Sequence, residues 1–130
     1  MRKRAVKGTT PAGPYSPGIV VDERLVFVSG QGPVRDGVMV PGTIEEETRL
    51  VLENVRAVLA EAGASTDDAV RCGVFLADLD DFAAMNEVYA EFFGDPPPAR
   101  TTVGALLPGI KVEIDCIAVL PQADRGGRED

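Results

Sequence analysis

The spacing of hydrophobic residues predicts a long amphipathic helix in the first half of the chain. Thr43 is followed three residues later by Glu46, the arrangement of an N-terminal capping box, and Gly63 provides a stop signal. Between them, apolar residues and one threonine recur at intervals typical of a helix. This stripe consists of Ile44, Thr48, Val51, Leu52, Val55, Val58, Leu59 and Ala62. We therefore expect one face of the helix to be buried on a sheet.

A second helix is predicted between Asp78 and Gly94. The side chain of Asp78 or Asp80 is suited to cap its first amides. Its stripe of large apolar residues consists of Phe82, Met85, Tyr89, Phe92 and Phe93. Prolines occupy residues 96–98 and favour a stiff, extended linker after the helix.

Segments with a two-residue period predict the later strands. Residues 69–76 have this pattern, and so does the longer segment 110–120. Residues 100–106 are expected to form a further strand between them. In the last segment the even positions are apolar, whereas the odd positions begin with Lys111, Glu113 and Asp115. The final strand should therefore present one face to the core and a polar face away from it.

Shorter apolar runs precede the first helix. Residues 19–21 and 25–28 flank the polar segment 22–24, a pattern that predicts a β-hairpin. Residues 38–40 follow a turn at Gly37 and are expected to form a short strand. The complete order is strands, helix, strand, helix, strands. This order predicts an α+β domain in which two helices cover one face of a mixed sheet.

The length of 130 residues fits one domain with one core. We assign that domain to residues 1–120, and we expect the polar, glycine-containing segment 121–130 to be a flexible tail. Ile117 and Val119 interrupt the polar side of the last strand. Another subunit is therefore expected to cover part of that face.

Composition narrows the possible partners and chemistry. The formal net charge of -8 disfavours nucleic acids. No apolar run is long enough to span a membrane, and the basic first residues are not followed by an apolar stretch, so a cytoplasmic protein is expected. Because the chain has no histidine, His-based acid–base catalysis and most zinc or iron sites are excluded. Cys72 and Cys116 form no CxxC pair and are expected to be buried and reduced, with no metal.

Arg100 and Glu113 are the main candidates for chemistry. Arg100 follows three prolines and Ala99 at the start of a predicted strand, and its planar fork suits a carboxylate. The alternative is an exposed or structurally paired arginine. Glu113 projects from the polar face of the last strand. That face is either solvated or closed by another subunit, and closure would put Glu113 in a cleft where it could activate water.

Other polar positions give weaker signals when each is taken alone. Tyr15 lies in the rigid turn 13–18, and Ser29 ends an apolar strand. Asn86 lies within the second helix among core residues, where a structural cap or a surface position is the alternative to a functional role.

Taken together, several short motifs resemble the RidA/YjgF family over residues 7–119. The motifs are Gly13-Pro14-Tyr15-Ser16, Ser29-Gly30-Gln31, Asn54-Val55, Asp81-Phe82 with Asn86-Glu87-Val88-Tyr89, Pro98-Ala99-Arg100-Thr101-Thr102-Val103 and Val112-Glu113-Ile114-Asp115. Pro17, Gly18 and Pro97 depart from the usual family residues at the edge of the pocket. The Arg100 and Glu113 pair is retained.

This resemblance implies a chorismate-mutase-like fold and a homotrimer with a central barrel, outer helices and clefts between subunits. It also implies a 2-iminobutanoate/2-iminopropanoate deaminase, a hydrolase without metal or cofactor. Such an enzyme converts reactive enamines and imines, including 2-aminoacrylate released by pyridoxal-phosphate enzymes, into 2-keto acids and ammonia. A non-catalytic trimer that binds small carboxylates is the main alternative. A ribonuclease is disfavoured by the acidic charge and the absence of histidine.

The resemblance further implies a role for each matching residue. Arg100 would hold the substrate carboxylate, and Glu113 would position the attacking water. The remaining substrate-binding residues implied are Tyr15 and Ser29 in the pocket, Thr102 through its backbone, and Asn86 at the pocket edge.

Overall fold

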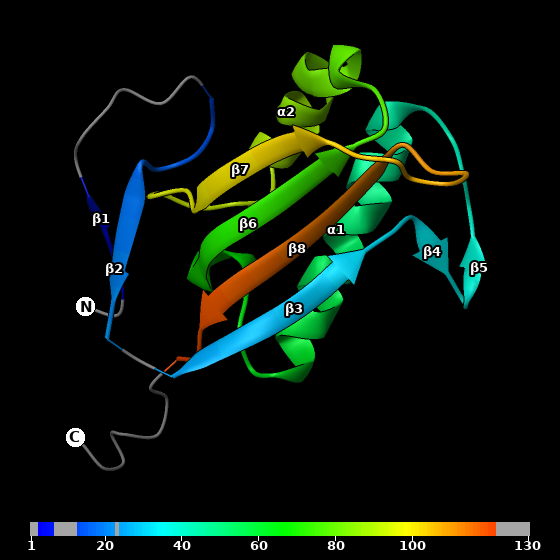
Figure 1. Cartoon of the computed structure of the whole chain (residues 1–130). Helices are drawn as coiled ribbons and strands as arrows, with labels where there is room; N and C mark the ends of the chain where they lie inside the picture. The colour runs from blue at the N-terminus through cyan, green and yellow to red at the C-terminus, as the bar shows by residue number, and fades with distance from the viewer. Residues whose placement is uncertain (1–2, 7–12, 23, 122–130) are drawn as a thin grey trace.

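The computed structural model describes residues 3–6, 13–22 and 24–121, and a four-stranded sheet is its central element (Figure 1). The strand order is β3-β8-β6-β7. The bounds are β3 (Leu25–Gln31), β6 (Ala69–Leu76), β7 (Ala99–Gly104) and β8 (Val112–Val119). β6 and β7 are parallel, whereas the other neighbours are antiparallel. The predicted mixed sheet is confirmed.

Two helices, α1 (Ile44–Glu61) and α2 (Phe82–Ala90), pack on one face of this sheet (Figure 1). The α+β architecture expected from the sequence is therefore confirmed. The short 3-10 turns η1 (Thr66–Asp68) and η2 (Leu79–Asp81) precede β6 and α2. The capping box of Thr43 and Glu46 is present at the start of α1. Gly63, with φ of 87°, adopts after the helix a left-handed conformation that favours glycine.

The buried stripe of α1 follows the predicted period with two differences. Val51, Leu52, Val55 and Leu59 are fully buried, but Val58 is 37% exposed and Ala62 is also exposed. Leu50 and Glu47 are buried in addition. The pattern missed Glu47 because a carboxylate is normally excluded from a core unless it is hydrogen-bonded. Here its two oxygens accept the backbone N–H groups of Lys111 (2.7 Å) and Gly42 (3.1 Å).

The predicted hairpin of residues 19–28 is wrong. β2 (Gly18–Val21) pairs with β1 (Lys3–Val6), and β3 pairs with β8. Both runs are strands, as their composition indicates. Adjacency in sequence did not determine their pairing, because β8 provides β3 with a longer partner whose inward residues complete the core. The expected short strand near residue 38 is β5 (Val38–Met39), which forms a small ladder with β4 (Val34–Arg35).

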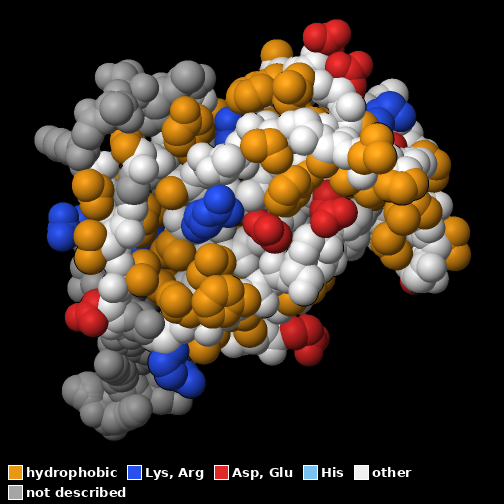
Figure 2. Space-filling model, in the orientation of Figure 1, with side chains coloured by type: hydrophobic (Ala, Val, Ile, Leu, Met, Phe, Trp, Pro, Cys, Tyr) orange, Lys and Arg blue, Asp and Glu red, His pale blue; other side chains and the backbone are white. Residues whose placement is uncertain are grey.

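The uncovered face of the sheet combines apolar and charged side chains. Glu113, Asp115 and Ile117 alternate along β8 with the buried residues of the core face, as predicted. Val119, which was expected to need cover from another subunit, is instead fully buried within the chain. On the neighbouring strand Phe27, the register partner of Ile117, is 69% exposed. Figure 2 shows hydrophobic side chains gathered over β3 and β8 beside charged ones.

The remaining predictions concern the cysteines and the tail. Cys72 and Cys116 are register partners on β6 and β8, and both are buried free thiols, which confirms the expectation. Residues 122–130 of the expected tail lie outside the described residues. Among the described residues, no helix is long and apolar enough to cross a membrane.

Candidate active site

A turn before β2 is fastened to the beginning of β7. The backbone N–H of Ser16 donates to the carbonyl oxygen of Pro98 (2.9 Å), and the buried Ser16 hydroxyl donates to the carbonyl oxygen of Pro97. These bonds hold Tyr15 beside Arg100, the second residue of β7. Two segments far apart in sequence thus meet at the predicted arginine.

Arg100 is enclosed by one amide and three aromatic rings. Its Nη1 donates to Oδ1 of Asn86 on α2 at 2.6 Å. Its guanidinium carbon lies 4.9 Å from the ring centre of Tyr89, 5.0 Å from that of Tyr15 and 5.5 Å from that of Phe82. Rings at these distances stabilise a cation through their negative faces.

The charge of Arg100 is not neutralised by any acidic side chain of the described residues. Burial lowers the pKa of its guanidinium from the ordinary value, and the neighbouring tyrosines oppose that change. An arginine nevertheless stays protonated in proteins. A partly buried cation whose neighbours are neutral has lost hydration without gaining a counter-charge, so it favours the approach of an anion.

Glu113 lies on the other face of the sheet from Arg100. Arg100 is the register partner of Cys72 and shares the helix-covered face, whereas Glu113 pairs with Phe75 and points to the uncovered face. The Glu113 carboxylate lies against Gly30 of β3, where an added Cβ would come within 2.1 Å of Oε2.

The two carboxylates of this face differ in their partners. Asp115 accepts the N–H of Gly73 (2.7 Å) and lies 3.8 Å from Arg71. Glu113 has neither a hydrogen bond nor an ion pair within the part of the chain that the structure describes. Of the two, Glu113 is therefore the carboxylate available to water or a ligand.

The predicted site residues thus fall into two groups. Arg100, Tyr15 and Asn86 lie together, and Thr102 shares the face of β7 that carries Arg100. The Thr102 hydroxyl is buried and has no hydrogen-bond partner within the described part of the chain. Ser29 is exposed on β3 beside Gly30, so it belongs with Glu113.

Phe82 and Tyr89 were expected only as core residues, and their contacts with Arg100 were missed. Asn86 was the feature of the sequence from which these contacts could have been predicted. It interrupts the apolar stripe one turn after Phe82 and three residues before Tyr89, so all three side chains lie near one another on the helix.

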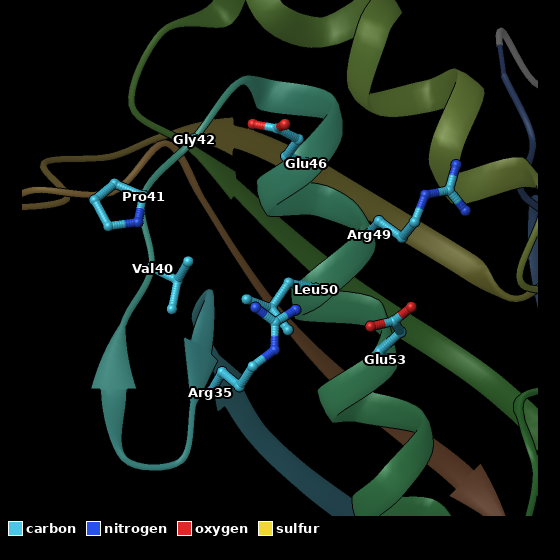
Figure 3. Close-up of a pocket in the computed structure, with 8 residues that line it drawn as sticks. All are labelled: Arg35, Val40, Pro41, Gly42, Glu46, Arg49, Leu50 and Glu53. Atoms are coloured by element: carbon cyan, nitrogen blue, oxygen red, sulfur yellow. The ribbon is translucent and has the colours of Figure 1, made fainter.

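A separate surface groove of about 370 Å³ lies between the β4–β5 ladder and α1 (Figure 3). Arg35 reaches toward Leu50 and Glu53, and Arg49 on the opposite side is paired with Glu91 at 2.9 Å. The lining carries both signs of charge and contains none of the substrate-binding or catalytic residues predicted from sequence. Among the described residues, no three Cys, Asp or Glu side chains gather as metal ligands would.

The fold is that of a small α+β protein, and its candidate site centres on a partly buried arginine with neutral partners among the described residues. Comparison with known proteins identifies the family. The profile of the family described as Endoribonuclease L-PSP matches residues 6–120. The mitochondrial protein mmf2 of Schizosaccharomyces pombe is 54% identical over 111 residues, covering 82% of this chain and 87% of the relative. A goat (Capra hircus) 2-iminobutanoate/2-iminopropanoate deaminase is 40% identical over 117 residues, covering 87% and 85%.

A solved structure from Yersinia pestis, described as a member of the conserved Rid family, superposes with a TM-score of 0.79 at 27% identity, covering 92% of this chain and 100% of that one. The chain belongs to the YjgF/RidA family, as its motifs indicated. Since the S. pombe relative is mitochondrial by name, the cytoplasmic location expected here stays a prediction.

Proposed function

We propose that this protein is a homotrimeric deaminase that hydrolyses 2-imino acids such as 2-iminobutanoate and 2-iminopropanoate to 2-keto acids and ammonia. The observation that carries the proposal is the state of Arg100, a partly buried cation with only neutral partners among the described residues. Such a group suits the carboxylate of a small acid. The deaminase name of the goat relative supplies the reaction class.

The separation of the two candidate groups supports an assembly of several subunits, and the family resemblance implies that there are three. Arg100 and Glu113 occupy opposite faces of one sheet, so they act on one small substrate only if different protomers contribute them. The exposed Phe27 and its apolar neighbours supply a surface for that contact. In the proposed assembly the sheets form a central barrel, and each cleft combines Arg100 of one protomer with Glu113 and Ser29 of the next.

The reaction needs only these groups and water. Arg100 fixes the carboxylate, which orients the imine carbon toward a water molecule held by Glu113. As the water oxygen attacks that carbon, Glu113 accepts a proton, and it returns the proton to nitrogen in the tetrahedral intermediate. The hydroxyl group of this intermediate then gives its proton to Glu113, which passes it to the nitrogen. The C–N bond breaks as the C=O bond of the 2-keto acid forms, and ammonia leaves. In this proposal Tyr15 lines the cleft, and the Thr102 backbone and the Ser29 hydroxyl bond substrate or water.

Complementation between two inactive variants tests the shared site. Arg100→Ala should weaken substrate binding by about 10- to 150-fold, from the ~1.5–3 kcal/mol of a charged hydrogen bond, and Glu113→Gln should remove the proton acceptor. With the two variants co-expressed under different tags and purified on both, each mixed trimer holds one complete site, so about one third of the wild-type activity should return.

The substrate is made in place by a pyridoxal-phosphate serine dehydratase acting on serine. Mixed trimers that assemble but stay inactive would contradict the shared site. Wild-type protein that leaves the decay of the imine unchanged, yet is stabilised by small carboxylates, would instead be a binding protein.

A further inference from the structure

The two arms of the Arg100 guanidinium have different surroundings. Nη1 donates to the Asn86 amide oxygen at 2.6 Å, and Asn86 is held on α2 between Phe82 and Tyr89. Nη2 lies beside Gly13, where an added Cβ would be 3.3 Å from this nitrogen and 3.4 Å from the Tyr15 ring. One arm is thus occupied, and the other faces a residue without a side chain.

The backbone conformation of Gly13 does not explain why this position is a glycine. Gly13 is absent from the residues with positive φ, which are Asp36, Gly37, Gly63 and Gly109, so other residues could adopt its conformation. Its carbonyl accepts the N–H of Tyr15 (2.9 Å), a contact that any residue could make. The missing side chain therefore matters for the space that it leaves beside Nη2.

The amide group of Asn86 is also suited to its contact with Arg100. An amide oxygen orients the guanidinium without cancelling its charge, whereas a carboxylate there would form an ion pair and compete with an anionic ligand. Asn86 contacts Arg100 directly, so its effect on a ligand is exerted through that side chain.

We propose that Asn86 is a positioning residue that fixes the Arg100 fork while leaving it charged, and that Gly13 keeps Nη2 open as the point of entry for the carboxylate. The carboxylate then binds side-on, through Nη2 and Nε, the remaining parallel pair of donors. This inference rests on the proposed function and assigns the determinants of its anion specificity.

Asn86→Asp is the decisive variant because it preserves the shape of the side chain and the oxygen that accepts from Nη1, while it adds a negative charge and replaces the Nδ2 donor by an oxygen. The Kd for pyruvate and the KM for the imino acid should each rise about tenfold or more. kcat should stay within about threefold, because the lost contact is made equally before and during the chemical step. Ala57→Asp adds the same charge at an exposed position of α1, away from α2, and should leave both constants unchanged.

Gly13→Ala gives an independent measurement should Asn86→Asp fold poorly. Its Cβ should crowd Nη2 and raise the Kd for pyruvate several-fold without lowering thermal stability. Either folded variant binding pyruvate as tightly as wild type would overturn the inference. Wild-type protein that binds no pyruvate would overturn the proposed function itself, so the two failures are distinguishable.

Discussion

Tyr89 combines complete burial with an unpaired hydroxyl. Its ring centre lies 4.6 Å from that of Phe93 and 4.9 Å from the guanidinium carbon of Arg100. Its hydroxyl, however, has no hydrogen-bond partner among the described residues. Burial, with Cys72 alongside, raises the pKa of the phenol above the ordinary value near 10. The folded chain therefore holds this proton more firmly than the unfolded chain. By linkage, the stabilisation is complete below about pH 10 and is lost as the pH rises further.

Tyr89→Phe should separate the ring from the hydroxyl. We expect the free energy of unfolding at pH 7 to stay unchanged or to rise by up to ~1 kcal/mol, because an unpaired buried hydroxyl is removed. The loss of stability between about pH 9 and about pH 11 should become smaller. Urea unfolding at both ends of this range measures the effect, with the half-buried Tyr15→Phe as control. A marked destabilisation at pH 7 would mean that the hydroxyl is bonded.

At the scale of elements, Glu47 joins the beginning of α1 to the segment between β7 and β8. Its carboxylate accepts two backbone N–H groups, from Lys111 and Gly42, and lies 3.6 Å from the Lys111 ammonium. The side chain is fully buried. Because Lys111 immediately precedes β8, this contact helps to fix the strand that carries Glu113.

Glu47→Ala should lower the free energy of unfolding by about 2–4 kcal/mol, because two backbone amides would lose a charged partner inside the protein. Glu47→Gln keeps one acceptor and should cost less. Glu45→Ala, an exposed substitution in the same helical turn, should cost below about 1 kcal/mol. Equal losses for Glu45→Ala and Glu47→Ala in urea titrations would refute the role assigned to the buried carboxylate.

At the scale of the whole molecule, the sheet has one face covered by helices and one that is not. Leu25, Phe27 and Ile117 lie together on the uncovered face, beside the charged residues of β8 (Figure 2). A monomer that left such a surface in water would forgo the free energy of apolar burial. The proposed trimer removes this surface from solvent and brings Glu113 to a neighbour's Arg100 in the same step.

Phe27→Asp should therefore dissociate the protein, because each interface would have to bury an unpaired carboxylate. Size-exclusion chromatography with light scattering should give a trimer for wild type and monomers for the variant. Imine hydrolysis should fall together with the trimer. Val58→Glu alters an exposed apolar residue of α1 and should leave the assembly intact. A Phe27→Asp protein of unchanged mass would place the interface elsewhere.

The sequence by itself determined the elements and much of their burial. The capping box at Thr43 and the alternation along β8 are local patterns, and each requires only neighbours within a few residues. The same holds for the helix stop at Gly63. The motifs likewise sufficed for the family, because they retain their order and spacing along the chain.

Only the tertiary structure decided which elements meet. It paired residues 18–21 with β1, buried Glu47 by supplying two amides, and set Asn86, Tyr15 and two aromatic residues of α2 around Arg100. It also placed Arg100 and Glu113 on opposite faces of one sheet. Such outcomes depend on contacts between distant segments, which a local pattern does not encode. A two-residue period shows that side chains alternate between the faces of a strand, but it does not show which strand lies alongside or what covers each face.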